Sequence, residues 1–551
     1  MNSFARDMTP TVNLTRERGA GAVRHQRPLY VDLRPPCNSA CPAGENIQAW
    51  LGLAQAGKYR AAWETLIRDN PLPAVHGRVC YHPCETNCNR KELDSAVSIH
   101  AVERFLGDLA MQQDWPMPVD KVSGGKRVLV VGAGPSGLSA AYHLTRLGHQ
   151  VEIHDAGPLP GGMLHFGIPA YRLPRDELMK EIGRIERMGV KFVPDHRVDD
   201  VLAEQKAGGF DAVFIAIGAH LSKHVDIPAR DAIKVLDAVS LLRDVEGGTA
   251  PRLGRRVVVY GGGNTAMDVA RTVRRLGVAE PMIVYRRDRE HMPAHDFEAG
   301  EALTEGVKIK WLTSIKAIDG ADLTVEVMRI DESGHAQPTG QFETLKADTL
   351  VLALGQDADS GFLKKIPEIA FDRDGSVVVA PNMMTGRAGI FAGGDMVPAE
   401  RSVTVATGHG KKAAHHIDAW LRGEVYAHPA KHPIVGFADL SLPIYADAQP
   451  SIQHELPITQ RERDFDEVVS GLSEKEALHE AKRCLSCGNC FECDQCYAAC
   501  PEQAIIKLGP GLRYKFDYDR CTGCAVCAEQ CPCSAITMTP EPSRASVEQM
   551  A

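Results

Sequence analysis

The sequence predicts a mixed α/β protein whose middle holds parallel sheets and whose two ends are rich in cysteine. Five of the sixteen cysteines lie between Cys37 and Cys88, eleven lie between Cys484 and Cys533, and none lies between these groups. In the middle, short Val/Ile-rich runs alternate with longer helical patterns, which is typical of βαβ units and parallel sheets. A chain of 551 residues exceeds the size of one core, so we expect several domains.

The composition narrows the class of protein. A net charge of -9 argues against a nucleic-acid partner. The chain has no apolar run long enough for a membrane span. The first thirty residues are polar and lack the apolar core of an export signal, so we expect a cytoplasmic protein with a flexible N-terminal tail. In such a protein, sixteen cysteines favour metal or redox ligation over structural disulfides.

The first dinucleotide-binding motif lies in RVLVVGAGPSGLSAAYHL, where the apolar strand at 128–131 runs into a turn and a helix. Gly132, Gly134 and Gly137 form the G-x-G-x-x-G pattern, which lets backbone N–H groups approach a pyrophosphate at a helix N-terminus. Asp155 ends the next strand, about where an acid binds the adenosine ribose. A tight turn without a ligand is the alternative, and the added acid favours a dinucleotide site.

A second motif follows the strand VVVY and offers Gly261, Gly263 and Ala266. Its next strand, MIVY, ends in Arg286 and Arg287 instead of an acid. Guanidinium groups at that place suit the 2′-phosphate of NADP better than the bare ribose of NAD. The alternative is a solvated basic edge. The sequence therefore favours NADP over NAD.

Two such motifs in one chain indicate a flavin site and a nicotinamide site. Downstream, GIFAGGDM places Gly394 and Asp395 after a short strand, where the carboxylate could hold the ribityl hydroxyls of a flavin. If Asp395 completes the site that Gly132 begins, the nicotinamide domain is inserted in the FAD domain. The order along the chain is then FAD, NAD(P), FAD.

Several longer motifs resemble one family. GMLHFGIPAYRLP, GGGNTAMDVARTVRRLG, VYRRDREHMPA, LALGQ and GIFAGGDMV are similar to signatures of the small subunit of NADPH-dependent glutamate synthase and its relatives, from about residue 35 to 419. The resemblance implies a helical iron-sulfur domain, an FAD domain and an NAD(P) domain with Rossmann-like folds. It also adds residues to the cofactor sites: Gly161, Gly162, Asn264, Thr265 and Gln356. Hydride moves directly between the two cofactors, so we expect no acid or base among the catalytic residues.

Two cysteine runs near the C-terminus each have the spacing C-x2-C-x2-C-x3-C, which is typical of two-cluster bacterial ferredoxins. In those proteins the fourth cysteine of each run ligates the other cluster. One [4Fe-4S] cluster would therefore use Cys490, Cys493, Cys496 and Cys531. The other would use Cys521, Cys524, Cys527 and Cys500.

The N-terminal cysteines are Cys37, Cys41, Cys80, Cys84 and Cys88. By themselves they support one cluster. The family that the chain resembles holds two clusters here and uses an additional C-x-x-C pair further upstream, which this sequence lacks. The segment EAKRCLSCG, at the other end of the flavoprotein, resembles that missing pair. We therefore expect Cys484 and Cys487 to fold back and complete a cluster with Cys37 and Cys88.

The remaining N-terminal cluster would have three cysteines, namely Cys41, Cys80 and Cys84. By the same resemblance its fourth ligand is a Glu or Gln in the following helix, and Glu103 is the matching residue. This assignment uses fifteen cysteines for four [4Fe-4S] clusters and leaves Cys533 free. The alternatives are that Cys484 and Cys487 are a relic pair beside the ferredoxin clusters, and that Glu103 is an exposed helix residue.

The predicted domains follow from these motifs. They are a tail (1–30), a helical iron-sulfur domain (31–122), the FAD domain in two parts (123–248 and 366–427), the NAD(P) domain (249–365), a connector (428–479) and an α+β ferredoxin-like domain (480–551). We expect an electron-transfer subunit that exchanges hydride with NAD(P)(H) and single electrons with a partner enzyme, in either direction. The expected partner is a 2-oxoacid:acceptor oxidoreductase or a similar multi-subunit complex. The alternatives are a glutamate synthase small subunit and a non-catalytic electron relay.

Overall fold

The computed structural model describes residues 24–119, 125–223, 227–230 and 233–542. Residues 1–23 of the predicted tail lie outside these ranges, but Gln26–Tyr30 forms strand β1. This strand pairs antiparallel with β20 (Ile536–Pro540), with Tyr30 opposite Ile536. A flexible tail up to residue 30 is therefore wrong for these five residues, because backbone pairing with the far end of the chain holds them.

Short helices form the domain that follows β1. They are α1 (Pro36–Ala40), α2 (Ile47–Gln55), α3 (Tyr59–Leu66), α4 (Pro73–Val79), α5 (Pro83–Thr86), the 3-10 helix η2 (Asn89–Glu92) and α6 (Ile99–Gln112). Two glycines let α4 and α6 approach closely. A Cβ on Gly77 would lie 2.5 Å from the Cβ of Arg104, and one on Gly107 would lie 2.4 Å from the backbone N of Ala74. Helix α6, which carries Glu103, is thus held against the helix that leads into Cys80.

The first sheet is parallel, with strand order β17-β5-β2-β3-β4. Its strands are β2 (Arg127–Val131), β3 (Gln150–His154), β4 (Lys191–Val193), β5 (Ala212–Ile215) and β17 (Ile390–Ala392). Around it lie α7 (Pro135–Arg146), α8 (Met163–Phe166), α9 (Arg175–Arg187), α10 (Val201–Gly208), η3 (Gly361–Lys365), η4 (Gly394–Met396) and α14 (Val403–Leu421). Buried side chains of this sheet and of the N-terminal helices belong to one continuous hydrophobic core. The helical domain is therefore packed on the first domain, where α4 contacts the covering helices α9 and α14.

A second parallel sheet has the order β11-β10-β9-β15-β8, and an antiparallel sheet beside it has the order β14-β13-β12-β7. The parallel strands are β8 (Lys234–Asp237), β9 (Arg256–Tyr260), β10 (Glu280–Val284), β11 (Lys308–Lys310) and β15 (Thr349–Leu352). The antiparallel sheet contains β7 (Ala229–Arg230), β12 (Thr313–Asp319), β13 (Asp322–Ile330) and β14 (Ala336–Lys346), in which β7 runs parallel to β12. The helices are α11 (Ala238–Glu246), α12 (Asn264–Arg275) and α13 (Asp296–Thr304).

The second unit is inserted in the first. Strands β6 (Leu221–Ser222) and β16 (Gln356–Asp357) pair antiparallel where the chain leaves the first domain and returns to it. After the return, β17 joins the first sheet next to β5. The predicted order FAD, NAD(P), FAD is confirmed at the level of the fold. The inserted unit begins before the predicted residue 249, because β7 and β8 pair with its strands.

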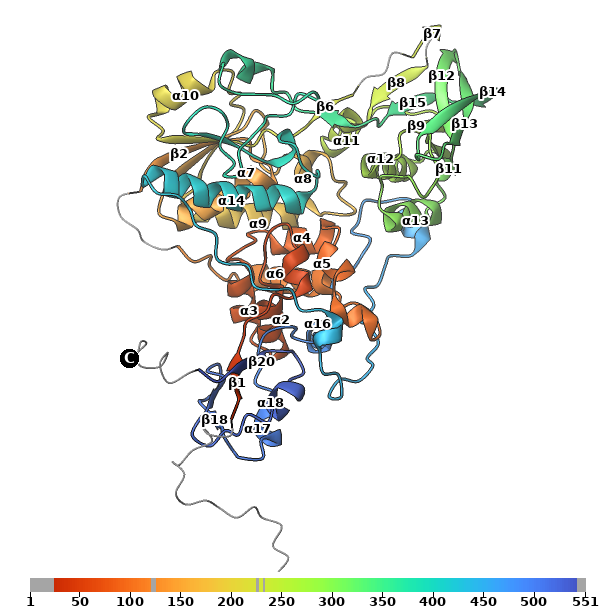
Figure 1. Cartoon of the computed structure of the whole chain (residues 1–551). Coiled ribbons are helices and arrows are strands. Elements are labelled where there is room, and N and C mark those ends of the chain that lie inside the picture. The colour runs from red at the N-terminus through yellow and green to blue at the C-terminus, as the bar shows by residue number, and fades with distance from the viewer. Residues whose placement is uncertain (1–23, 120–124, 224–226, 231–232, 543–551) are drawn as a thin grey trace, which may run out of the picture.

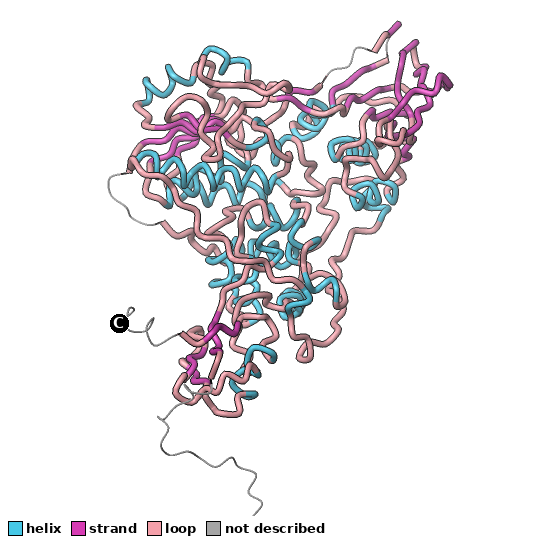
Figure 2. The backbone as a smooth tube through the Cα atoms, in the orientation of Figure 1, coloured by secondary structure: helices cyan, strands magenta, loops and turns pink. Residues whose placement is uncertain are grey.

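The C-terminal module contains β18 (Ile505–Lys507), β19 (Tyr514–Phe516), β20, α17 (Gln495–Ala499) and α18 (Val526–Glu529). It lies with β1 at one end of the molecule, beyond the N-terminal helices, and the two larger domains lie at the other end (Figure 1). The predicted connector is mostly loop (Figure 2), with η5 (Phe437–Asp439), α15 (Ile458–Arg461) and the first residues of α16 (Glu474–Arg483). Within the described residues, no helix has both the length and the apolar character of a membrane span.

Candidate functional site

A cavity of about 900 Å³ lies between the two dinucleotide motifs. Both motifs and the returning segment line it: Gly132, Gly134, Asp155, Gly162, Gly263, Asn264, Thr265, Gln356, Gly394 and Asp395. Of the other predicted cofactor residues, Gly137, Gly161, Gly261, Ala266, Arg286 and Arg287 do not line it. The size and the mixture of apolar walls with a few polar groups are typical of a cofactor site. The cavity therefore brings the predicted flavin motif and the predicted nicotinamide motif together.

The first glycine turn is shaped for close approach of a ligand to the backbone. Gly132 has φ +106°, and a Cβ there would lie 2.5 Å from the carbonyl oxygen of Ala216. A Cβ on Gly137 would lie 1.9 Å from the carbonyl oxygen of Gly132. Gly134 is the N-cap of α7 and has no side chain to cap the helix, so the first backbone N–H groups of α7 remain unpaired within the helix. This end of the helix lines the cavity. This cradle fits the pyrophosphate of a dinucleotide.

Asp155 is held at the end of β3 by the turn itself. Its Oδ2 accepts a hydrogen bond from the backbone N of Ala133 at 2.7 Å, and its Oδ1 accepts one from the backbone N of Gly157 at 2.7 Å. Each carboxylate oxygen has a second lone pair. The fixed carboxylate can therefore still accept hydrogen bonds from ribose hydroxyl groups.

Another part of the cavity wall comes from the returning segment, where a Cβ on Gly394 would lie 3.1 Å from the Cβ of Ser136. Burial raises the pKa of Asp395 to about 6. Gly161 does not line the cavity, and its backbone N donates to the carbonyl oxygen of Ala133, in the first glycine turn, at 2.8 Å. Arg401 and Ser402, which the sequence did not single out, also line the cavity at the start of α14. Ser402 is the N-cap of that helix and accepts from the backbone N of Val405, a capping signal that the sequence contains.

The second glycine turn has the same features. Gly261 has φ +155°, and a Cβ there would lie 2.2 Å from the carbonyl oxygen of Ala353. Gly263 is the N-cap of α12, and Ala266 is fully buried at the third position of the motif. Arg286 is exposed after β10 and Arg287 is half-buried. Among the residues that the structure describes, neither arginine has a carboxylate within 4.0 Å, so both charges remain available for a phosphate.

An ion cluster joins the two dinucleotide domains beside the cavity. Arg172, in the segment between α8 and α9, lies 2.9 Å from Asp268 of α12 and 2.6 Å from Glu298 of α13. The side chains of Asp268 and Glu298 are buried. The motif GIPAYRLP contains Arg172, but Asp268 is 96 residues away in sequence and Glu298 is further still. Sequence reasoning could not assign this role.

Cys41, Cys80, Cys84 and Glu103 lie together in the N-terminal domain. Burial and the charge of Glu85 raise the pKa of the Cys84 thiol well above its usual value. Charges on Cys80, Cys41 and Glu103 raise this pKa further, and the elements that carry or adjoin the four groups pack together, α1 on α5 and α4 on α6. Cys84 is buried and Cys41 and Cys80 are half-buried, and these three thiols with one buried carboxylate form a donor set suited to a metal cluster. The residues fit a [4Fe-4S] cluster with one carboxylate ligand.

Glu103 is buried, with 6% of its surface exposed, so the alternative of an exposed helix glutamate is wrong. Burial and the charge of Glu45 raise the pKa of Glu103 well above its usual value. Asn70 Nδ2 donates to Glu103 Oε1 at 2.8 Å and to Glu45 Oε1 at 3.0 Å, which fixes both carboxyl groups. A buried carboxylate is costly unless a cation or metal compensates it. Sequence reasoning missed the two positioning residues, Asn70 and Glu45.

Replacing Glu103 with alanine should lower the iron content by about four atoms per chain, because one cluster loses its fourth ligand. Glu103→Gln keeps an oxygen at the same place and should retain the iron. The measurement is iron per protein after anaerobic purification. Glu64→Ala, at an exposed helix position, is the matched control. Equal iron in Glu103→Ala and the control would show that Glu103 is not a ligand.

The second group joins the two ends of the chain. Burial raises the pKa of the Cys37 thiol well above its usual value, and Cys484, Cys88 and Cys487 raise it further. Burial and the charge of Cys487 raise the pKa of Cys484 to about 12. Asn89, directly after Cys88, donates from its Nδ2 to Cys487 Sγ at 3.5 Å, so the structure brings together the cysteines that the resemblance assigns to one cluster. Their place in the molecule disfavours a relic pair beside the ferredoxin module.

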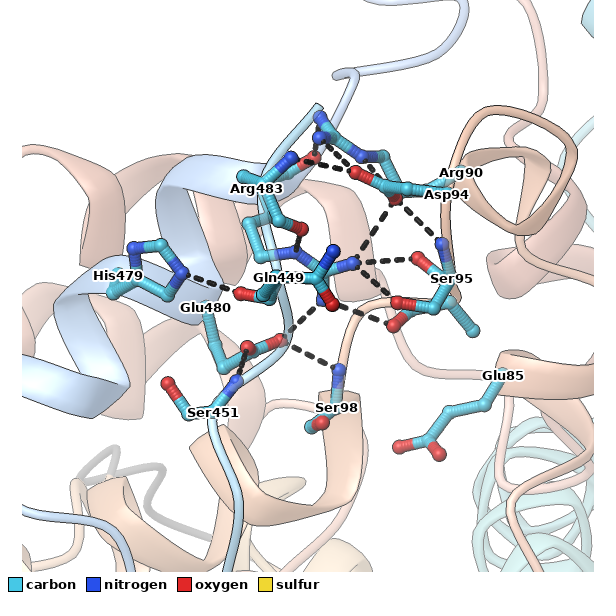
Figure 3. Close-up of polar contacts among 12 residues, drawn as sticks. Glu85, Arg90, Asp94, Ser95, Ser98, Gln449, Ser451, His479, Glu480 and Arg483 are labelled. Atoms are coloured by element: carbon cyan, nitrogen blue, oxygen red, sulfur yellow. Dashed lines mark hydrogen bonds and ion pairs between the residues drawn. The ribbon is translucent and has the colours of Figure 1, made fainter. Parts of the chain in front are cut away.

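Helix α16 places Cys484 through a buried polar network, shown in Figure 3. Arg483, 1% exposed at its side chain, lies 3.1 Å from Asp94 and 2.8 Å from Glu480. Glu480 Oε2 also accepts from the backbone N of Ser98, the N-cap of α6. Arg90 returns a hydrogen bond to the carbonyl oxygen of Arg483 at 3.0 Å. Both side chains and the backbone at the end of α16, directly before Cys484, are thus bonded to the N-terminal domain.

The ferredoxin-like module contains two further groups of thiols. Burial raises the pKa of Cys496 to about 11, and the charges of Cys490, Cys531 and Cys493 also raise it. The second group lines one cavity: Cys500, Cys521, Cys524 and Cys527. Each group contains the fourth cysteine of the other run, as the ferredoxin spacing predicts. Cys533 is buried, with its Sγ 3.8 Å from the Sγ of Cys531.

The chain matches three family models. The model described as pyridine nucleotide-disulphide oxidoreductase matches residues 125–410. Dihydropyrimidine dehydrogenase domain II, a 4Fe-4S cluster domain, matches residues 17–115, and a 4Fe-4S dicluster domain matches residues 489–535. These matches confirm the predicted oxidoreductase core and the iron-sulfur modules at both ends.

Three relatives illustrate the similarity. The beta subunit of NADP(+)-dependent formate dehydrogenase from Moorella thermoacetica is 35% identical over 521 residues, covering 86% of this chain and 73% of the relative. The beta subunit of NADPH-Fe(3+) oxidoreductase from Geobacter sulfurreducens is 33% identical over 505 residues, covering 82% and 75%. The NADPH glutamate synthase small chain of Azospirillum brasilense is 32% identical over 424 residues, covering 71% and 88%. The resemblance drawn from the motifs is confirmed.

Proposed function

This chain belongs to the pyridine nucleotide-disulphide oxidoreductase family, and on that premise we propose that it is the NADP(H)-linked subunit of a multi-subunit redox enzyme. It is an iron-sulfur flavoprotein of the electron-transfer type. The observation that carries the proposal is the single cavity that both dinucleotide motifs line. Two nucleotide cofactors bound to these motifs would share one cavity.

FAD, when bound, exchanges hydride with the nicotinamide and single electrons with [4Fe-4S] clusters. The chain itself supplies binding and orientation. Gly132 and Gly134 offer backbone N–H groups to the pyrophosphate, and Asp155 offers a carboxylate to the ribose. Gly263 repeats the first role for NADP. No side chain is needed to move a proton in the hydride step.

The cysteine groups form a series that starts at the cavity. Val79 and Tyr81 line the cavity and flank Cys80, so the group that contains Cys80 and Glu103 is adjacent to the flavin site. The group of Cys37 and Cys484 follows in the same domain.

The remaining steps of the series lead outward. The Tyr445 hydroxyl donates to the carbonyl oxygen of Leu485, next to Cys484, at 2.8 Å. Burial raises the pKa of Tyr445, and charges on Cys533, Cys484 and Cys493 raise it further, so Tyr445 is near both the group of Cys37 and Cys484 and the ferredoxin module. Cys524, which belongs to the second group of the ferredoxin-like module, is exposed. We propose that electrons enter or leave the chain at this face, where a partner subunit would bind.

NADPH should bleach the flavin absorbance of the purified protein under anaerobic conditions. In Arg286→Ala/Arg287→Ala the NADPH concentration for half-bleaching should rise by about 10- to 100-fold, because the 2′-phosphate loses its charged partners. The NADH concentration for half-bleaching should stay unchanged. Arg255→Ala, another exposed arginine of the same domain, is the control. If neither NADPH nor NADH bleaches the flavin, the alternative of a non-catalytic electron relay is favoured.

The partner determines the substrate. The sequence favours a 2-oxoacid:acceptor oxidoreductase or a similar complex, and a formate dehydrogenase is the further candidate that the relative from Moorella thermoacetica adds. The glutamate synthase alternative has less support, since that small chain aligns over 424 residues and the formate dehydrogenase subunit over 521. Purification from the native source with a tag on this chain tests the proposal. A co-purifying dehydrogenase subunit supports it, and a glutamate synthase large subunit supports the alternative. The cytoplasmic location stays a prediction.

A further inference from the structure

Three side chains outside the cysteine groups converge on one point of the flavin domain. His154 is the last residue of β3, His196 follows β4, and Glu204 lies in α10. One nitrogen or oxygen atom of each lies within 4.8 Å of the others. His154 and His196 also line the cavity, close to Asp155. The site thus joins three separate elements at the end where we place the adenosine.

The distances match those between ligands of a small divalent metal. Glu204 Oε1 lies 3.2 Å from His154 Nδ1 and 3.1 Å from His196 Nε2. In a tetrahedral zinc site with bonds of about 2.0–2.1 Å, neighbouring ligand atoms are about 3.3 Å apart. Two imidazoles and one carboxylate are a ligand set that zinc uses in proteins, with a fourth position left for water.

The unsatisfied Nδ1 of the buried His154 side chain indicates a ligand that is not part of the protein. This side chain is 7% exposed, and its Nδ1 makes no acceptable hydrogen bond to any described residue, although Glu204 is near. Its other nitrogen, Nε2, lies 3.7 Å from Glu152 Oε2. A metal-bound histidine usually has a carboxylate or carbonyl beside its second nitrogen. Burial lowers the pKa of His154, so the ring can be neutral and offer a lone pair at Nδ1.

We propose that His154, His196 and Glu204 form a divalent metal site, best suited to Zn²⁺, that is separate from the four cysteine groups. The metal would tie the ends of β3 and β4 to α10 and so fix the backbone that presents Asp155. Loops that follow parallel strands are where flexibility would otherwise loosen a cofactor site. The inference does not depend on which redox partner the chain has.

Zinc binding to the holoprotein tests this site. Purified holoprotein, with its iron and flavin in place, is mixed with one equivalent of Zn²⁺ and desalted, and zinc is counted per chain. Wild type should keep about one zinc, with nitrogen and oxygen neighbours at about 2.0–2.1 Å in zinc-edge X-ray absorption and no sulfur at about 2.3 Å. His196→Ala and Glu204→Gln should each weaken zinc binding by more than about tenfold. Iron content should not change.

Matched controls are His454→Ala and Glu186→Gln, which replace exposed residues elsewhere. Sulfur neighbours in wild type would place the zinc on cysteines and overturn the proposal. Failure of wild type to retain zinc would overturn it as well, and so would equal binding by the variants and the controls. Loss of flavin with zinc retained in His196→Ala would assign the histidine to the flavin instead. None of these outcomes bears on whether NADPH bleaches the flavin of wild type.

Discussion

A variant with both Cys484 and Cys487 replaced by serine should lose about four iron atoms per chain, while the two ferredoxin-type clusters remain. The expectation follows from the position of these thiols beside Cys37 and Cys88, which burial and mutual charge identify as one group. Serine removes two of four thiolate ligands and leaves the backbone unchanged. The measurement is iron and acid-labile sulfide per chain, with electron paramagnetic resonance of the reduced protein to identify the clusters that remain.

Cys533→Ser is the matched control for this variant. Cys533 is also buried and belongs to the same C-terminal segment, but it lies outside the four ligand groups. The control should keep its iron. Unchanged iron in the Cys484→Ser/Cys487→Ser variant would show that this pair ligates no cluster. Loss of about eight iron atoms would mean that the ferredoxin module depends on the pair.

Replacing Arg483 with methionine should destabilise the protein by about 3–5 kcal/mol, the usual cost of removing one partner from a buried ion pair. Asp94 and Glu480 would keep their charges without the guanidinium between them. The hydrogen bonds from Arg483 to the carbonyl oxygens of Ser95 and Ala96 would also be lost. The change should appear as a lower apparent melting midpoint at a fixed heating rate, together with loss of iron from the adjacent cluster on storage.

Lys482→Met is the control, because it replaces the neighbouring basic residue of α16 at an exposed position. This variant should melt like wild type. Equal melting midpoints of the two variants would contradict a stabilising role for the buried network. The pKa of Asp94, which the hydrogen bond from Arg90 holds well below its usual range, indicates that its charge persists through the neutral range.

Much of the fold could be predicted because its signals are local. The central parallel strands, such as β2 and β9, are short runs of buried apolar residues, and each glycine turn stands directly before a helix. The pairing of β1 with β20 could not be predicted, since the two strands are about 500 residues apart and neither has a turn that would indicate a hairpin. The start of the inserted domain was placed too late for a similar reason. Its first strands are short, with only two residues in β7.

The site could be predicted where a cofactor requires a fixed spacing. The glycine motifs and the two ferredoxin runs are of this kind. Residues that act through tertiary contacts were missed, such as Arg172 at the domain boundary and Asn70 beside Glu103. The pair Cys484 and Cys487 could be predicted only in part, because its motif is local but its partners lie at the other end of the chain. The resemblance to a displaced motif identified the pair, and the structure adds Arg483 as the residue that positions it.

The iron content of the intact, anaerobically purified protein tests the shared cluster most directly. Four complete groups of ligands predict about sixteen iron atoms per chain, with matching acid-labile sulfide. About twelve iron atoms in fully loaded protein would contradict the proposal that Cys484 and Cys487 complete a cluster with Cys37 and Cys88.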